Sequence, residues 1–223
     1  MLEARKLTVA FDGRVLFENL SLSIAPGERV QIAAPSGAGK TTLCRVLAGY
    51  LAPQAGKVLV DGAPLPKKGP CPVQLIGQHP ERALDPRLRM EASLMEALAG
   101  QGANADEGGR RSRRARIRSP RESLSESSTA LLLEALGIQS RWLARYPHEL
   151  SGGEMQRFCI ARALLANPRY LIADEISTML DAVTQAQIWS VLLHQAAQRD
   201  LGLIFVSHSP ALASRLATRV IPL

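Results

Sequence analysis

Residues 29–41 read RVQIAAPSGAGKT and combine three local signals in a fixed order. The first five residues have the composition of a short buried strand. A loop with two glycines follows, and from residue 41 to residue 51 the apolar side chains recur at helical spacing. A strand, a glycine-rich loop and a helix in succession predict a phosphate-binding unit within an α/β fold.

The loop fits the pattern G-x-x-x-x-G-K-[ST] except at its first position, where Ala34 replaces glycine. In such loops the backbone N–H groups point at phosphate, the lysine reaches the β- and γ-phosphates, and the last hydroxyl ligates Mg²⁺. Ala34 reduces nucleotide affinity only if its position needs a positive φ, where a Cβ costs about 1–2 kcal/mol. The residues expected to contact nucleotide here are Ser36, Gly37, Ala38, Gly39, Lys40, Thr41 and Thr42.

Residues 170–175, YLIADE, place two carboxylates at the end of an apolar strand. In a parallel sheet this strand end lies beside the phosphate loop, so the pair resembles the Walker B element. Asp174 is then expected to hold Mg²⁺, and Glu175 to polarise the water that attacks the γ-phosphate. The plain alternative is two solvated acids at a strand end.

Residues 150–154 read LSGGE and match the signature of the ATPases of ATP-binding cassette (ABC) proteins. Ser151 occupies the position of a helix N-cap. Gly152 and Gly153 have no side chains to cover the backbone N–H groups, so the helix start can bind phosphate. Five matched residues in the expected chain order disfavour an ordinary cap. The resemblance implies that this motif contacts ATP held by a second subunit, so neither monomer holds a complete site.

Four further positions resemble ABC motifs, each weak by itself and informative through its order along the chain. Gln78 resembles the Q-loop glutamine, which senses the γ-phosphate and Mg²⁺, and His208 resembles the switch histidine. Residues 178–181 occupy the D-loop place, with Asp181 expected near nucleotide, and Phe11 resembles the aromatic residue that stacks on adenine. The candidate catalytic residues are therefore Glu175, His208 and Gln78, and the candidate metal ligands are Thr41, Gln78 and Asp174.

The fold that this resemblance implies is an α/β P-loop NTPase core with a mainly parallel sheet, an N-terminal antiparallel β subdomain and an inserted helical subdomain. The periodicities agree with it. They predict an antiparallel pair at 7–11 and 20–24, further strands at 57–60, 73–77, 170–173 and 203–207, and helices at 154–166 and 181–199. We expect a single ABC ATPase domain over residues 1–223.

The helical subdomain is expected at residues 88–150, with helical spacing at 90–98 and 131–136. Within it, residues 101–128 are too polar to offset the entropy of ordering, so they are expected to form a disordered surface loop. Residues 109–121 contain seven arginines and no acid, which accounts for the formal net charge of +7. This segment is either a solvated insertion, the interpretation we favour, or a patch attracted to anionic lipid headgroups.

The apolar runs are far shorter than the about 20 residues needed to span a bilayer, and the N-terminus lacks the profile of a secretory signal. We therefore expect a cytoplasmic protein, and the ABC resemblance implies that it is peripheral on the inner face of the cell membrane. Three widely spaced cysteines, Cys44, Cys71 and Cys159, predict buried free thiols rather than a disulfide framework or a zinc site.

The resemblance implies an ATP- and Mg²⁺-dependent ATPase that pairs with a second ABC ATPase subunit, identical or homologous, and drives integral membrane permease subunits. The segments QHPE (78–81), RYPHEL (145–150) and QAQIW (185–189) resemble the peptide and nickel importer branch. One alternative is a soluble ABC ATPase acting on nucleic acid or ribosomes. Another is a regulatory partner that hydrolyses ATP poorly, suggested by Ala34 and by Met179 in the D-loop.

Overall fold

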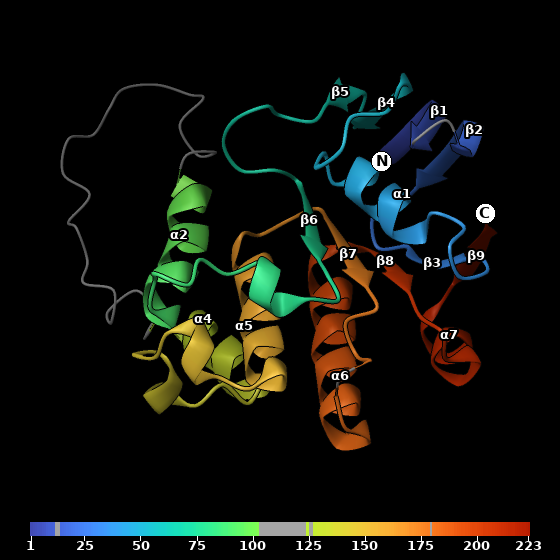
Figure 1. The fold of residues 1–223 in the computed structure, drawn as a ribbon. Coiled ribbons are helices and arrows are strands. Elements are labelled where there is room, and N and C mark those ends of the chain that lie inside the picture. The colour runs from blue at the N-terminus through green and yellow to red at the C-terminus, as the bar shows by residue number, and fades with distance from the viewer. Residues whose placement is uncertain (12–13, 103–123, 125–126, 179) are drawn as a thin grey trace. The chain divides into compact units, whose positions relative to one another are not determined.

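A computed structural model of the chain describes residues 1–11, 14–102, 124, 127–178 and 180–223 (Figure 1). The chain forms two compact units. The first contains Met1–Gly77, Pro168–Ile176 and Leu192–Leu223, and the second contains Gln78–Asn167 and Ser177–Val191. The arginine-rich residues 109–121 lie outside the described residues, as does most of the predicted loop at 101–128. The boundaries 88–150 for a helical subdomain stay a proposal.

The first unit contains an antiparallel sheet, as the alternating apolar residues near the N-terminus predicted. Its strand order is β2-β1-β4-β5. Alternate residues of β1, such as Leu7 and Val9, are buried, which explains why this segment is a strand with one face on the core. The strand bounds are Leu2–Phe11 for β1, Arg14–Ile24 for β2, Ala55–Val60 for β4 and Ala63–Pro64 for β5.

The first unit also contains a parallel sheet of strand order β6-β7-β8-β3-β9, with every neighbouring pair parallel. Strands β7 and β8 are buried along their whole length, which is why both read as continuous apolar runs. Parallel strands present their carboxyl ends at one edge, and the phosphate loop, the acidic pair and the switch segment all begin there. The bounds are Val73–Ile76 for β6, Tyr170–Asp174 for β7, Gly202–Val206 for β8, Arg29–Ala33 for β3 and Arg219–Pro222 for β9.

Two helices belong to the first unit, α1 (Lys40–Leu47) and α7 (Pro210–Leu216). The apolar face of α1 is part of one core with buried side chains of both sheets. Helix α1 ends four residues before the predicted residue 51, because Gly49 adopts a left-handed φ of 77° and the amide of Tyr50 bonds back to the carbonyl of Arg45. Such a glycine turn closes a helix by satisfying its last carbonyl groups.

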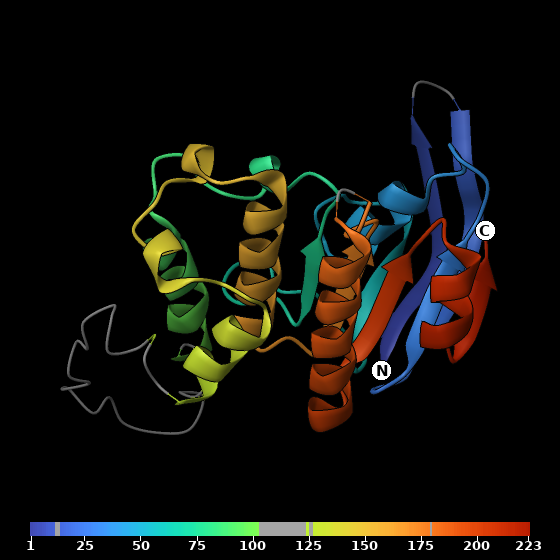
Figure 2. The same ribbon diagram turned by 90° about the horizontal axis from the view of Figure 1, so that it is seen from below.

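The second unit is built from helices (Figure 2). Its helix α5 contributes the buried side chains of Phe158 and Ile160. Helix α6 begins in this unit and ends in the first. No described helix is both long and apolar enough to cross a membrane. The bounds are Pro80–Arg82 for η1, Met90–Gly102 for α2, Ser127–Ala135 for α4, Ser140–Trp142 for η2, Pro147–Glu149 for η3, Gly152–Leu165 for α5 and Ala182–Arg199 for α6.

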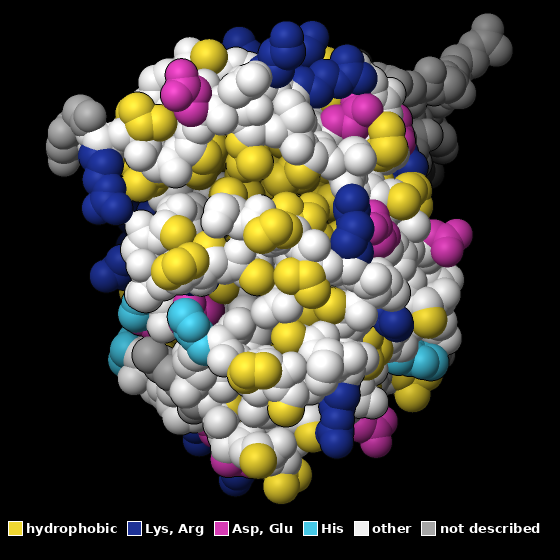
Figure 3. Space-filling model, turned by 90° about the vertical axis from the view of Figure 1, so that its right-hand side faces the viewer, with side chains coloured by type: hydrophobic (Ala, Val, Ile, Leu, Met, Phe, Trp, Pro, Cys, Tyr) yellow, Lys and Arg dark blue, Asp and Glu magenta, His cyan; other side chains and the backbone are white. Residues whose placement is uncertain are grey.

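The three cysteines are free thiols. Cys44 and Cys159 are buried as predicted, and burial raises the pKa of Cys159 to about 11. The prediction of burial was wrong for Cys71, which is only half-buried because it stands in the loop that precedes β6. On the face drawn in Figure 3, the Lys and Arg side chains of the described residues lie in several separate places, among hydrophobic and other side chains. This face therefore lacks a single continuous basic stripe.

Candidate functional site

The phosphate loop, residues 34–39, joins β3 to α1, and its two glycines take up left-handed backbone angles, φ 78° at Gly37 and φ 94° at Gly39. These are conformations that a side chain disfavours. Lys40 is only 8% exposed, and its Nζ atom donates to the carbonyl oxygens of Ala34, at 2.9 Å, and Pro35, at 3.0 Å. The lysine charge is thus fixed inside the loop at the start of the helix.

Ala34, the departure from the loop pattern, is not among the described non-glycine residues with positive φ. Ala34 therefore does not incur the strain energy that a Cβ has at a positive φ, and no loss of nucleotide affinity is expected from that source. Ala34 thus no longer supports the alternative of a regulatory subunit that hydrolyses ATP poorly. The other residue that suggested this alternative, Met179, lies outside the described residues.

Asp174 ends β7 and is 4% exposed, and its Oδ1 atom is buried without a hydrogen-bond partner. Burial raises the pKa of Asp174, and the side-chain hydrogen bond with Thr41 acts in the opposite direction. A buried carboxylate oxygen with spare acceptor capacity and a neighbouring hydroxyl is the kind of donor set that Mg²⁺ takes together with nucleotide phosphates. The described residues contain no cluster of three or more His, Cys, Asp or Glu side chains that could hold a metal by themselves.

Glu175 follows Asp174 and has a left-handed φ of 53°, which is uncommon for a residue with a side chain. Its Oε1 atom lies 2.8 Å from Nε2 of His208, the second residue after β8. The glutamate is much less exposed than the histidine. The structure thus brings together two of the predicted catalytic residues as one acid and imidazole pair, which can hold and polarise a water molecule.

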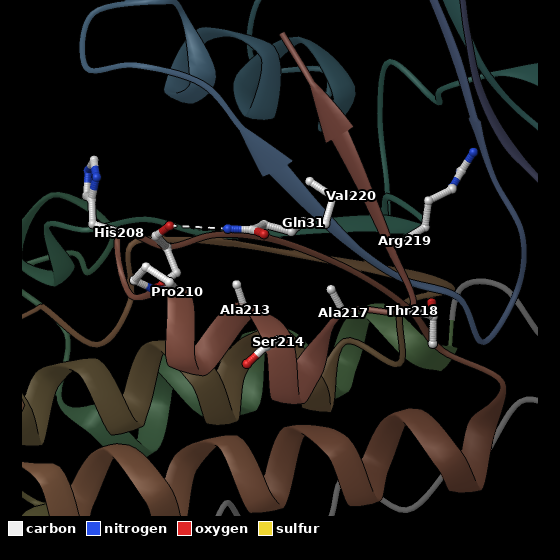
Figure 4. A pocket seen from close by; sticks show the side chains of 10 residues that line it. Gln31, His208, Pro210, Ala213, Ser214, Ala217, Thr218, Arg219 and Val220 are labelled. Carbon is white, nitrogen blue, oxygen red and sulfur yellow. Dashed lines mark hydrogen bonds between the residues drawn. The ribbon is translucent and has the colours of Figure 1, made fainter.

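A pocket of about 480 Å³ lies in the first unit, with His208 among its lining residues. Its most buried polar lining residue is Gln31 of β3, whose Nε2 donates to the carbonyl oxygen of Ser207 at 3.4 Å. Figure 4 shows this bond, with Ala213 of α7 and Ala217, the residue after α7, on the other side of the pocket. Gln31 was missed at the sequence level, although a glutamine in the middle of an apolar strand is a signal for such a contact.

The predicted signature residues lie at the start of α5 in the second unit. The Oγ atom of Ser151, the N-cap, accepts from the amide of Glu154 at 3.3 Å, and the Glu154 carboxylate accepts from the amide of Ser151 at 2.8 Å. This reciprocal pair is a capping box. A Cβ at Gly152 would meet open space, whereas one at Gly153 would lie 3.2 Å from Cδ2 of Leu180. The capping box therefore holds the helix start in place, with Gly152 exposed and Gly153 partly covered by Leu180.

Asp181 caps the next helix, α6. Its Oδ1 atom accepts from the amides of Val183 and Thr184, both at 3.0 Å, and the hydrogen bonds from Thr184 lower the pKa of the Asp181 carboxyl. Asp181, which was predicted to lie near nucleotide, thus also has a structural role in its own chain. It accepts hydrogen bonds from amides that have no partner within the helix.

The remaining predicted residues are Gln78 and Phe11. Gln78 lies two residues after β6, at the beginning of the second unit, so the predicted strand 73–77 ends one residue early. Phe11 is the last residue of β1, beside the undescribed residues 12–13, and is 47% exposed. The exposed ring offers a surface for stacking.

The sequence matches the ABC transporter family over residues 17–178, which is most of the chain. The chain belongs to the ABC transporter family. The matched residues include the phosphate loop, the signature and the acidic pair. His208 lies beyond the match, so its inclusion in the ABC site depends on its contact with Glu175.

Relatives of this ABC chain include the glutathione import ATP-binding protein GsiA of Pectobacterium atrosepticum, which is 35% identical over 210 residues and 91% of this chain. GsiA of Salmonella typhi is 34% identical over the same share of the chain. The chain spans 31% of the length of each of these two relatives.

Solved structures of ABC proteins share the fold. An ATP-binding subunit of an ABC transporter aligns with a TM-score of 0.79 and 23% identity, covering 100% of this chain and 85% of that one. A dimeric ATP-binding cassette bound to ADP and Pi aligns with a TM-score of 0.77 and 24% identity, covering 100% of this chain and 94% of that one. The predicted α/β fold with a mainly parallel sheet and an N-terminal antiparallel sheet is confirmed.

Proposed function

We propose that this chain is an ATP-hydrolysing subunit that energises an ABC membrane transporter. The observation that carries the proposal is the Glu175–His208 contact of 2.8 Å, made at the sheet edge where the phosphate loop also begins. An acid held by an imidazole beside a phosphate-binding loop is suited to hydrolysis rather than to binding alone.

In the proposed reaction, the loop amides and Lys40 bind the β- and γ-phosphates. Glu175 accepts a hydrogen bond from the attacking water, and His208 holds the glutamate and faces the developing charge on the γ-phosphate. Asp174 and Thr41 would hold Mg²⁺, with Gln78 as a further ligand. When bound, this ion would neutralise charge on the phosphate oxygens. Phe11 would stack on adenine.

We infer that the ATP site is completed by a second subunit. The capped start of α5 is a positively polarised helix end with two glycines, which fits a phosphate that approaches from outside the chain. Ser151, Gly152 and Gly153 would contact that phosphate, with Asp181 close by. Closure on ATP and opening after hydrolysis would then move the attached permease.

The substrate class of the transporter is proposed from the relatives. Proteins 34–35% identical to this chain are named for glutathione import, and glutathione is a small peptide. The same assignment to a peptide, nickel or related small-solute importer follows from the QHPE and RYPHEL segments. The expected partners are integral membrane permease subunits and a second ABC ATPase, identical or homologous, at the inner face of the cell membrane.

Two variants with different defects test this function. Lys40→Ala should lose nucleotide binding, because the ammonium in the loop is removed. Ser151→Arg should keep nucleotide binding to the monomer and lose hydrolysis, because a bulky cation at the α5 start blocks the second subunit. Binding is measured with a fluorescent ATP analogue and hydrolysis by phosphate release. If both variants bind and cleave ATP as the parent does, the proposal is wrong.

A further inference from the structure

Arg157 of α5 joins three elements of the second unit through one guanidinium group. Its Nη1 atom donates to the carbonyl oxygen of Leu136 at 2.5 Å and to Oε1 of Gln187 at 3.3 Å. Its Nη2 atom donates to Oγ1 of Thr184 at 3.0 Å. Leu136 directly follows α4, whereas Thr184 and Gln187 lie in the first two turns of α6. Hydrogen bonds from a charged group are about twice as strong as neutral ones, so this is a firm connection.

The chain leaves space for this guanidinium at Gly137. A Cβ there would lie 2.5 Å from Nη1 of Arg157, which is closer than such atoms approach, and Gly137 also has a left-handed φ of 66°. Gln187 also connects α6 to α4 directly, because its Nε2 donates to the carbonyl oxygen of Ala135 at 2.8 Å. The end of α4, the middle of α5 and the start of α6 are therefore held together by polar contacts as well as by packing.

Two described residues at the D-loop, Asp181 at its end and Ser177 just before it, are hydrogen-bonded to the same part of α6. Asp181 accepts from the amide of Thr184, whose hydroxyl accepts from Arg157. In addition, Nε2 of Gln185 donates to Oγ of Ser177 at 3.0 Å. Each of these two residues thus has a bond to α6.

The signature motif, residues 151–154, reaches the D-loop directly. A Cβ at Gly153 would lie 3.2 Å from Cδ2 of Leu180, a tighter contact than most Cβ atoms make, so the two residues pack closely. The signature helix therefore reaches the D-loop in two ways. Gly153 contacts Leu180 directly at the helix start. One turn further along α5, Arg157 contacts Thr184 of α6, whose amide donates to Asp181.

We propose that Arg157 is a positioning residue that holds the signature motif and the D-loop residues Leu180 and Asp181 as one preformed surface for the nucleotide on the second subunit. This inference rests on the proposed function, in which that surface completes the ATP site. A surface that is already ordered does not have to lose conformational entropy when the subunits associate. Arg157 acts through Ser151, Gly153 and Asp181 and does not itself touch phosphate.

The first experiment measures amide hydrogen exchange in the full chain without nucleotide. Arg157→Gln should accelerate exchange about tenfold at the first turn of α5 and at the first turn of α6 together, because two charge-assisted bonds between them are lost. Arg162→Gln is the matched control, since Arg162 lies on the same helix and its side chain has no hydrogen-bond partner among the described residues. Unchanged exchange, or faster exchange near residue 157 alone, would overturn the proposal.

The second experiment separates positioning from general destabilisation. In a Glu175→Gln background, Arg157→Gln should raise the protein concentration needed for ATP-driven association about tenfold and leave ATP binding to the monomer within about twofold. Equal association of the two proteins would refute the role of Arg157. If the Glu175→Gln parent binds ATP and does not associate, the second subunit is not an identical chain, while hydrogen exchange still decides the role of Arg157.

A milder variant covers the case in which Arg157→Gln does not fold. Thr184→Val keeps the shape of the side chain and removes the hydroxyl, which accepts from Nη2 of Arg157 and also hydrogen-bonds the Asp181 carboxylate. It should change exchange in the same two segments, by a smaller factor. Normal exchange at both segments in Thr184→Val would count against the proposal.

Discussion

Glu175 meets His208 at 2.8 Å through a backbone conformation that glutamate normally avoids. A left-handed φ of 53° costs a residue with a Cβ about 1–2 kcal/mol. The conformation is held by its surroundings, since the amide of Glu175 donates to the carbonyl oxygen of Val206 at 3.2 Å. Strain of this kind persists where neighbouring contacts over-determine it, and at this position its effect is to direct the carboxylate to the imidazole.

Glu175→Gln is expected to bind ATP with an affinity close to that of the parent and to hydrolyse it at least about a hundredfold more slowly, because the amide is a poor proton acceptor for the attacking water. Binding is measured by titration with a fluorescent analogue and turnover by steady-state phosphate release. Glu18→Gln on the exposed part of β2 is the control and should turn over normally. Unchanged steady-state hydrolysis in Glu175→Gln would remove Glu175 from the reaction.

Asp174→Asn should stabilise the nucleotide-free protein while abolishing hydrolysis. Because burial raises the pKa of Asp174, the folded protein binds this proton more tightly than the unfolded chain does. Stability is then lost as pH rises through the interval between the unfolded and the folded pKa. At pH values above both pKa values, the buried ionised carboxylate of Asp174 destabilises the nucleotide-free protein. The neutral amide of Asn would remove this destabilisation.

The expected increase in Tm for Asp174→Asn is about 2–4 °C at neutral pH, and it should shrink as pH falls to the ordinary aspartate pKa of about 3.9. Thermal unfolding without nucleotide at several pH values measures it. Added Mg²⁺ and ATP should raise the Tm of the parent and not that of the variant, since the variant lacks the anionic ligand. A lower Tm for the variant at neutral pH would show that Lys40 already compensates the charge of Asp174 in the empty site.

Two glycines of the antiparallel sheet differ in what surrounds them. A Cβ at Gly56 would lie 2.3 Å from the carbonyl oxygen of Lys6, whereas one at Gly62 would meet open space, and both residues have a left-handed φ. Gly56→Ala should therefore destabilise the protein by about 3 kcal/mol or more, and Gly62→Ala by only about 1 kcal/mol. Urea unfolding followed by circular dichroism measures both. Equal losses would mean that β1 moves aside for the added methyl group.

Sequence reasoning recovered those parts of the fold whose signals are local. The strand, loop and helix around Lys40 are marked by a short apolar run, by two glycines and by helical spacing within twenty residues. By contrast, β9 was not predicted, because its four residues are mostly exposed and its strand character comes from pairing with β3, about 190 positions earlier in the chain. Periodicity carries no information about such a partner.

The same limit applies to the site. The cap at Ser151 was predictable because its partner, Glu154, is three residues away, and an N-cap followed by Glu at that spacing is a local pattern. Arg157 was not singled out, since an arginine on a helix is most often part of a solvated face. Its partners, Leu136 and Thr184, lie 21 and 27 positions away. Only the folded arrangement of the second unit identifies them.

Gly153→Ala offers a direct test of the contact between the signature motif and the D-loop. The added Cβ would press on Leu180 at 3.2 Å and displace the D-loop, so ATP-driven association should weaken about tenfold. Adding Leu180→Ala should restore much of the loss, because the smaller side chain makes room for the methyl group.

Gly152→Ala is the control, since its Cβ meets open space in the chain, and Leu180→Ala should not improve it. Association is measured by analytical ultracentrifugation in the Glu175→Gln background. If Leu180→Ala fails to rescue Gly153→Ala, this glycine serves only the approach of phosphate and not the packing of the D-loop.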